Sequence, residues 1–405
     1  MLISKRCRNL TPSATLEIAA KARKLRAEGI DIISLNAGEP DFDTPLHIKA
    51  AAMEAIQEGK TKYTAVGGTD QVKHAIVKKL EKENDLHYTT DEVMVSTGGK
   101  QVIFNALQAL IEKGDEVIII SPYWTSYPEM IRLVEGEPVV IETKLEHHYK
   151  LNPKDLHEAI SPYTKMIILN SPSNPAGVYY NEEELQIIAN IIVEHPKIIV
   201  LSDDVYEKIL FHETKFVNIV NVVPSLKDRT IIVNSLSKSY AMTGWRLGYA
   251  AGPALMIKEM SKIQSQSTSN PCSITQAAAV EALGKLSVEP VAEMLAKYTS
   301  RHAVVTARLS AVPGVKFTAP EGAFYMFPDV SELNEMLGFK DDFELTKFLL
   351  ETANVSVIPG SVFGIPNHIR ISFASNKSTI NKAFDRIDNA ISSLLDKLNE
   401  NTDDL

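Results

Sequence analysis

Cysteine and long apolar runs are both scarce in this 405-residue chain. The two cysteines, Cys7 and Cys272, lie far apart and form no CxxC pair, so neither a disulfide framework nor a cysteine-based zinc site is expected and a reduced, cytoplasmic setting fits best. No segment reaches ~18 uninterrupted apolar residues. The first ten residues carry only a short apolar dipeptide before their charges, which predicts neither a signal peptide nor a membrane span.

Positive charge is also in short supply. The chain has 42 basic and 51 acidic residues and a formal net charge of -9, which argues against a nucleic-acid surface. Small anionic substrates would therefore need locally placed cations. His147 and His148 are adjacent but have no third ligand at metal spacing, so no metal site is expected.

Short apolar runs alternate with helical patterns along the chain, as buried parallel strands do in an α/β sheet. One helix is predicted from Asn181, because Glu184 completes a capping box there. Another is predicted directly after the glycine pair of STGG (96–99), and its N-terminus is a potential anion site. The runs that indicate strands occupy residues 117–120, 166–169, 198–201 and 231–234.

The pattern changes beyond about Pro290, where a long helix, a further helix from Phe343 and a short strand indicate a smaller α+β unit. The predicted fold class is therefore α/β, with a mostly parallel central sheet flanked by helices plus a smaller α+β domain. We expect a large domain over residues 46–290, and a small domain made of residues 1–45 and 291–405.

The segment NSLSKSYAMTGWRLGY (234–249) carries the most chemical information. It places Lys238 just after two serines and eight residues before Arg246. Lysine forms a Schiff base only as the free amine, so a catalytic lysine needs a desolvated or cationic environment that lowers its pKa. Arg246 provides a cation and a fork for phosphate. The same residues also fit a solvated lysine and a surface arginine, and on this segment alone both interpretations stay open.

Ten ordered segments, spread over nearly the whole chain, carry a family resemblance. They are LNAGEPDFDTP (35–45), KYT (62–64), STGGKQ (96–101), SPYWTSYPEM (121–130), NSPSNPAG (170–177), SDDVYE (202–207), SLSKSYAMTGWRLGY (235–249), QSQSTSNPCS (264–273), PEGAFYMFPD (320–329) and IPGSVFG with IRISFA (358–364 and 369–374). Together they resemble the class I aminotransferases of the pyridoxal-phosphate (PLP) fold-type I group, specifically the bacterial aspartate-aminotransferase-like subgroup. The resemblance implies a PLP-dependent transaminase with a ping-pong mechanism.

The resemblance implies a role for each residue that would face the cofactor ring. Lys238 would hold the cofactor as a Schiff base and then move a proton between substrate and cofactor. Asp203 would pair with the pyridine nitrogen, although a strand-end aspartate by itself also fits a helix cap. Tyr206 and Asn174 would donate hydrogen bonds to the phenolic oxygen, and Trp124 would stack on the ring.

The phosphate of the cofactor would lie at the start of the helix that follows STGG, where backbone N–H groups and the helix dipole favour an anion. Tyr63 would reach it from the neighbouring subunit, so the resemblance also implies a homodimer with shared active sites. The other residues implied in phosphate binding are Gly98, Gly99, Lys100, Ser235, Ser237 and Arg246.

For the substrate, the resemblance implies that Arg370 binds the α-carboxylate as a bidentate fork. Gly38, Trp124 and Asn174 would lie beside it. Better-known aspartate aminotransferases bind the second carboxylate with an arginine just upstream of their SNP segment, where this chain has Ser265.

In the subgroup that the chain resembles, Lys100 together with Ser13 and Thr15 of PSAT (12–15) would take over the second carboxylate. L-Aspartate or another dicarboxylic amino acid, with 2-oxoglutarate, is then the expected substrate pair. An aromatic or prephenate aminotransferase, a β-lyase and a PLP-sensing regulator remain as alternatives, although the acidic balance argues against the DNA binding of the last.

Overall fold

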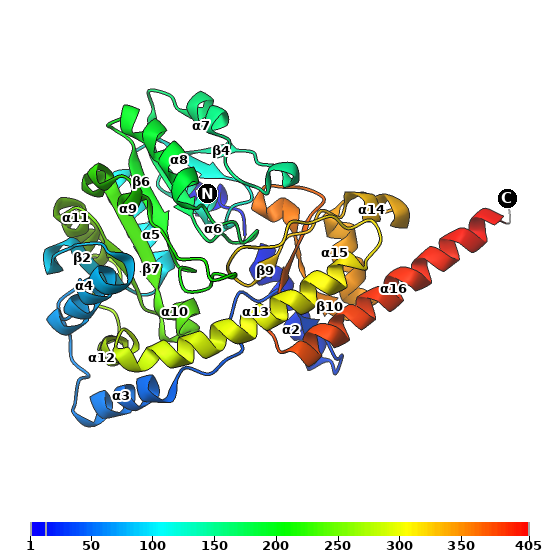
Figure 1. Cartoon of the computed structure of the whole chain (residues 1–405), viewed down its shortest axis with the longest axis horizontal. Helices are drawn as coiled ribbons and strands as arrows, with labels where there is room; N and C mark the ends of the chain where they lie inside the picture. Colours follow the sequence, from blue (N-terminus) through cyan, green and yellow to red (C-terminus); the bar gives the residue numbers. More distant parts are fainter. Residues whose placement is uncertain (1, 13, 404–405) are drawn as a thin grey trace.

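The computed structural model describes residues 2–12 and 14–403. Its largest part is built on a seven-stranded sheet with the strand order β2-β8-β7-β6-β5-β3-β4 (Figure 1). β8 pairs antiparallel with both neighbours, whereas the other pairs are parallel. In spatial order the strands span Val93–Ser96 (β2), Gly248–Ala251 (β8), Thr230–Ser235 (β7), Ile199–Asp203 (β6), Thr164–Asn170 (β5), Glu116–Ile120 (β3) and Glu137–Ile141 (β4).

The central strands are apolar on both faces because both faces are covered. Successive side chains of a strand point to opposite sides. In β6, Val200 packs into one hydrophobic cluster while Ile199 and Leu201 pack into another. In β7, Ile232 likewise lies on the side opposite to Ile231 and Val233. All four predicted strand runs form strands of this sheet, and the predicted α/β class is confirmed.

Helices form the two covering layers. One layer contributes α5 (Gly99–Leu110), α6 (Ser126–Leu133) and α11 (Ala254–Ser265). The opposite layer contributes α3 (Leu46–Gln57), α4 (Asp70–Asn84), α7 (Pro153–Ala159), α8 (Glu182–Glu194), α9 (Ile219–Val222), α10 (Leu236–Ser239) and α12 (Ser273–Ala282). Short 3-10 helices span Thr90–Glu92, Leu145–His147, Pro224–Arg229, Thr243–Trp245, Lys285–Ser287 and Gly360–Phe363.

Two predicted helices begin where their sequence signals place them. Asn181 is the N-cap of α8, its side chain accepts from the Glu184 N–H, and the Glu184 carboxylate accepts from the Asn181 N–H in return. This capping box satisfies two backbone donors that the first helical turn leaves unpaired. α5 begins at Gly99, directly after Gly98, and buries Val102 and Ile103 against the sheet.

A further hydrophobic cluster, separate from the two on the faces of the central sheet, joins the C-terminal elements to a short N-terminal strand. β1 (Ile33–Ser34) pairs parallel with β10 (Val355–Ser356), and β12 (Ile369–Ser372) lies between β11 (Ile358–Pro359) and β9 (Tyr325–Met326). The surrounding helices are α2 (Ala14–Ala27), α13 (Val288–Ser310), α14 (Ser331–Leu337), α15 (Asp342–Glu351) and α16 (Lys377–Asp403). Tyr206 and Phe211 also join this cluster, and α13 crosses residue 290. The division into domains stays a prediction.

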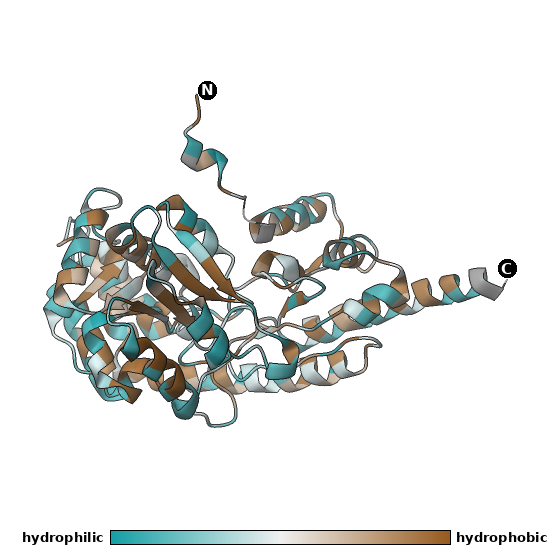
Figure 2. Ribbon diagram, turned by 90° about the horizontal axis from the view of Figure 1, so that it is seen from above, coloured by the Kyte–Doolittle hydropathy of each residue, from teal (hydrophilic) through white to brown (hydrophobic). Residues whose placement is uncertain are grey.

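The two ends of the chain lie apart from the core. The N-terminal residues, with α1 (Lys5–Arg8), extend away from the body, and the last turns of α16 project from it in another direction (Figure 2). Strands of the central sheet show as largely brown, apolar segments in the same view. Within the described residues, no helix is both long and apolar enough to cross a membrane.

Candidate active site

A cavity of about 340 Å³ opens where β5, β6 and β7 end. Asn170, Asp203 and Ser235 are the last residues of these three strands, and all three line it. The carboxyl ends of parallel strands are a common ligand site in α/β folds. Twelve of the residues singled out in the sequence line this one cavity: Gly38, Gly99, Lys100, Trp124, Asn174, Asp203, Tyr206, Ser235, Ser237, Lys238, Arg246 and Arg370.

Lys238 lies on α10, the short helix that follows β7. Its ammonium donates to the backbone oxygen of Gly38 at 2.5 Å. Burial lowers the pKa of Lys238 to about 8, and the positive charges of Arg370 and Arg246 act in the same direction, while Glu39 opposes them. A free amine is therefore accessible close to neutral pH, as a lysine nucleophile requires.

Asp203 ends β6, and its side chain is buried. Burial raises the pKa of this carboxyl to about 6, while hydrogen bonds from the Tyr127 hydroxyl and the Val205 N–H, together with Lys238, pull the pKa back down. An ionised carboxylate in such a place is favoured by a cationic partner. Asp204, by contrast, does not line the cavity and accepts hydrogen bonds from Ser202 and Asn218.

Arg370 lies in β12 and reaches the cavity from the C-terminal unit. Its guanidinium donates to Asn174 Oδ1 at 2.9 Å and to the Asn36 oxygen at 2.8 Å, and it lies over the ring of Tyr325. The buried Arg370 Nε has no hydrogen-bond partner among the described residues. Because buried polar atoms are normally paired, this cation is suited to an anionic ligand.

Tyr206 faces the same region from the segment after β6. Its hydroxyl lies 2.8 Å from the hydroxyl of Tyr325, and both side chains are buried. If Tyr325 donates within this pair, the Tyr206 O–H is left to donate elsewhere. Burial raises the pKa of Tyr206 well above its usual value, so the phenol stays protonated.

The start of α5 forms an anion cradle. Gly98 has φ +87° and no side chain caps the helix, so backbone N–H groups of the first turn face outward. A Cβ on Gly98 would stand 2.3 Å from the Arg246 guanidinium. Ser235 and Ser237 lie beside the cradle, with their hydroxyl oxygens 2.8 Å apart. Gly248 allows the backbone of β8 to approach the start of α5 closely, because a Cβ on this residue would lie 2.3 Å from the Gly99 nitrogen.

Lys100, in the first turn of α5, lies at the mouth of the cavity. Its ammonium is 4.8 Å from the centre of the Trp124 ring, an attractive cation–π arrangement. Desolvation and the nearby Arg246 lower the pKa of Lys100. Trp124 in turn packs edge-on against Tyr127, with ring centres 5.4 Å apart.

Some predicted site residues do not reach this cavity. Tyr63 is 92% exposed on the segment between α3 and α4, away from the cavity of its own chain. Gly98 does not line the cavity, although a Cβ built on it would lie close to the Arg246 guanidinium. Ser13 lies outside the described residues, as does the side chain of Thr15. Ser265 ends α11, where its hydroxyl donates to the Lys262 oxygen.

Four lining residues carry contacts that the sequence interpretation missed. Tyr127 donates to Asp203, Asn170 donates to the Asp203 oxygen, Tyr325 contacts Tyr206, and Asn36 accepts from Arg370 through its backbone oxygen. Tyr127 lies in SPYWTSYPEM and Tyr325 lies in PEGAFYMFPD. Their position in these family-like segments is what indicates, in the sequence, that they belong to the site.

A lysine, a carboxylate and a guanidinium that face one small cavity at the strand ends of an α/β fold suit an enzyme that acts on an anionic substrate. Residues 30–387 match the model of the family "Aminotransferase class I and II". The chain belongs to this family and is a transaminase, and the resemblance found in its sequence is confirmed.

Similar proteins match over almost their full length. The aspartate/prephenate aminotransferase of Nitrosomonas europaea is 47% identical over 399 residues, which cover 97% of this chain and 100% of the relative. The aspartate aminotransferase of Bacillus subtilis is 44% identical, covering 96% and 98%. Among solved structures, the aspartate aminotransferase from Rhizobium meliloti has a TM-score of 0.93 at 42% identity, covering 97% and 99%. That from Thermus thermophilus with maleate has a TM-score of 0.91 at 40% identity, covering 96% and 100%.

Proposed function

We propose that this transaminase uses pyridoxal phosphate to move an amino group from L-aspartate, or another dicarboxylic amino acid, to 2-oxoglutarate. The observation that carries the proposal is the shared cavity of Lys238 and Arg370. One group supplies an amine of lowered pKa, and the other supplies a buried guanidinium whose Nε lacks a partner within the described chain. An amino acid carries a carboxylate that would pair with the guanidinium and an amine that would take the place of the lysine amine on the cofactor.

The residues present fit pyridoxal phosphate. The uncapped start of α5, with Ser235, Ser237 and Arg246 beside it, suits a phosphate dianion. Buried Asp203 suits a protonated ring nitrogen, because a cation there favours the carboxylate that burial disfavours. Trp124 offers an aromatic face on the same cavity. The cofactor, when bound, supplies an electrophilic carbon for the amine and an electron sink for the bond that breaks at the substrate Cα.

Each protein group then has a task. Lys238 Nζ would hold the cofactor through its free amine and, when released from it, would take the proton from the substrate Cα. Arg370 orients that substrate through its α-carboxylate, so the Cα–H bond is held toward Lys238. Asn174 uses its Oδ1 to accept from Arg370, which leaves its Nδ2 to donate to the cofactor together with the Tyr206 hydroxyl.

Lys100 supports the preference for a second carboxylate. It lines the same cavity as Arg370, and its ammonium is held over Trp124. A cation in the first turn of a helix is electrostatically unfavourable, which argues for a function beyond helix stability. The resemblance in the sequence assigns Ser13 and Thr15 to the same proposed distal subsite. Relatives named aspartate aminotransferase, and the neighbour solved with the dicarboxylate maleate, agree with this preference.

Prephenate is the second candidate substrate, because similar proteins are named aspartate/prephenate aminotransferases. Its additional carboxylate would use the same Lys100 subsite. The proposal also includes a homodimer, argued from the exposed Tyr63, and a cytoplasmic location, argued from the free cysteines Cys7 and Cys272.

Replacing Lys100 by alanine tests the dicarboxylate preference. A hydrogen bond between charged groups contributes about 1.5–3 kcal/mol, so KM for aspartate should rise about 10- to 100-fold, while kcat/KM for alanine or phenylalanine changes little. Steady-state rates with aspartate, prephenate, phenylalanine and alanine measure this. An equal loss on all four substrates would contradict the assignment of Lys100 but would leave the transaminase itself intact.

A further inference from the structure

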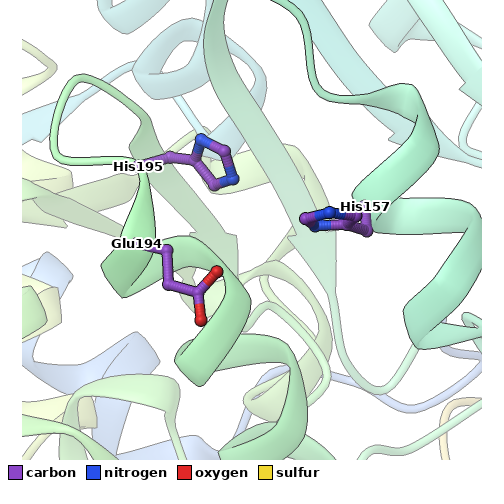
Figure 3. Close-up of side chains that lie close together, drawn as sticks. All are labelled: His157, Glu194 and His195. Atoms are coloured by element: carbon purple, nitrogen blue, oxygen red, sulfur yellow. The ribbon is translucent and has the colours of Figure 1, made fainter.

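Three metal-ligating side chains converge on the surface of the large sheet unit, away from the cavity. They are His157 of α7, Glu194 at the end of α8, and His195, the C-cap of α8. No two of their ligand atoms are more than 4.8 Å apart. Figure 3 shows both imidazoles and the carboxylate directed into one common space. None of the three lines the catalytic cavity.

The donor set selects the kind of ion. Two imidazoles and one carboxylate suit a borderline transition metal such as Zn²⁺, whereas Mg²⁺ and Ca²⁺ prefer oxygen ligands alone. Ligand atoms at ~2.1 Å from a shared ion lie at most ~4.2 Å apart. In a tetrahedral site such atoms lie ~3.4 Å apart, so the observed limit of 4.8 Å requires a closure of up to ~1.4 Å. His157 and Glu194 are exposed, so their side chains are free to make that adjustment.

His195 supplies a separate indication. Its Nε2 is buried, yet it has no hydrogen-bond partner among the residues that the structure describes. Buried polar atoms are nearly always paired, so an unpaired imidazole nitrogen calls for an explanation. Figure 3 shows a ring nitrogen of His195 on the side where His157 and Glu194 lie. A metal ion in that space would provide the missing partner.

The charges around these three side chains are compatible with a bound cation. The carboxyl end of α8 carries partial negative charge from its last carbonyl groups. Arg229 lies against this end, where its guanidinium donates to the oxygens of Ile192, His195 and Ile198. The positive charge of Arg229 disfavours a metal cation nearby, and the negative charge of the Glu194 carboxylate offsets this effect.

We propose that His157, Glu194 and His195 form a binding site for a divalent transition-metal ion, with Zn²⁺ as the expected occupant and water completing its tetrahedral coordination. The ion ties α7 to the end of α8. Binding to the folded chain alone stabilises it by mass action, so thermal stability rises with metal concentration. The site is independent of the transaminase reaction.

Calorimetric titration of metal-free, untagged holoenzyme with ZnCl₂ tests the site, and Co²⁺ replaces Zn²⁺ as a spectroscopic probe of tetrahedral coordination. Three variants remove one ligand each: His157→Ala, Glu194→Gln and His195→Asn. Each should weaken the binding of Zn²⁺ by at least about tenfold, because even substitutions that act on a ligand from outside cost that much. His147→Ala is the matched control, since it removes an exposed histidine that lies beside another histidine but outside the cluster.

The expected result is one Zn²⁺ per chain, a tetrahedral Co²⁺ spectrum, and a rise in melting temperature that the three variants lose and His147→Ala keeps. Glu194→Gln and His157→Ala alter exposed side chains, so their folding is checked by unchanged transaminase activity. Absence of Zn²⁺ binding, binding that survives in all three variants, or equal loss in His147→Ala would each overturn the proposal. None of these outcomes would bear on the proposed function.

Discussion

Burial shifts the pKa values of two ionisable groups of the active site toward neutrality from opposite directions. It lowers the pKa of Lys238 to about 8 and raises that of Asp203 to about 6. Each change favours the uncharged form of a group taken out of water. Near neutral pH, Lys238 thus has a usable fraction of free amine, while Asp203 is mostly ionised and ready for a cationic partner.

The lysine pKa predicts how cofactor uptake depends on pH. Only the free amine reacts, and its fraction rises as pH increases through about 8, so uptake should slow about tenfold per pH unit below that value and level off above it. Stopped-flow absorbance of apoenzyme mixed with pyridoxal phosphate measures the rate from pH 6 to 9.5. A midpoint near the ordinary lysine value would contradict the role of burial, and Lys238→Ala should show no lysine-bound absorbance band.

Asp203→Asn should retain the cofactor but lose most of the turnover. The amide keeps the shape of the side chain and removes the buried charge, and loss of one such electrostatic contact typically costs about 100-fold in kcat or more. The matched control is Asp204→Asn, because Asp204 is equally buried but bonded to Ser202 and Asn218 outside the cavity. Comparable losses of kcat in both variants would show that folding, not charge in the cavity, is affected.

The resemblance in the sequence predicted Lys238, Asp203 and Arg370 because such residues stand at fixed places in ordered segments. Contacts between residues that only the fold brings together could not be predicted from the sequence. Tyr127 and Asp203 are 76 residues apart, and the sequence does not show whether the hydroxyl of a tyrosine faces a core or a cavity. His157 and His195 are likewise too distant in the chain to form a metal-binding pattern.

At the scale of elements, sequence patterns predicted four continuously apolar strands of the central sheet (β3, β5, β6 and β7) and missed its other three. β5, β6 and β7 are almost fully buried and read as apolar runs. β8, with the sequence GYAA, contains residues of low strand propensity. β4 starts EPVVI at the edge of the sheet, where proline is tolerated. Tertiary pairing, rather than local sequence, forms these two strands.

Two glycine-to-alanine substitutions distinguish the effect of backbone strain from the effect of anion binding at the start of α5. Gly98→Ala forces a side chain into φ +87° and against the Arg246 guanidinium, whereas Gly114→Ala meets φ +90° with no atom within 4 Å. Both should lose about 1 kcal/mol of unfolding free energy. Only Gly98→Ala should also weaken the binding of pyridoxal phosphate. The affinity should fall tenfold or more, because a hydrogen bond to a charged group contributes about 1.5–3 kcal/mol. Equilibrium dialysis compares the two, and equal affinities would place the phosphate elsewhere.

At the scale of the whole molecule, the single chain leaves apolar surface uncovered next to Tyr63. On the neighbouring α3, Leu46, Met53 and Ile56 are 74%, 55% and 55% exposed. Large exposed apolar side chains gathered on one element are typical of an interface. A homodimer that covers α3 would bring Tyr63 to the partner subunit, where its hydroxyl is proposed to bind the phosphate.

Hybrid dimers test this shared site. One chain carries Tyr63→Ala and the other Lys238→Ala, so each parent homodimer is impaired in both of its sites. If Tyr63 serves the partner's cavity, the hybrid contains one site with both changes and one site with neither. Purified hybrids should then recover about half of the wild-type activity per dimer, as expected for a closed two-fold arrangement in which each subunit completes the other. If Tyr63 served its own chain, each site of the hybrid would carry one of the two changes. Activity would then stay at the level of the parents.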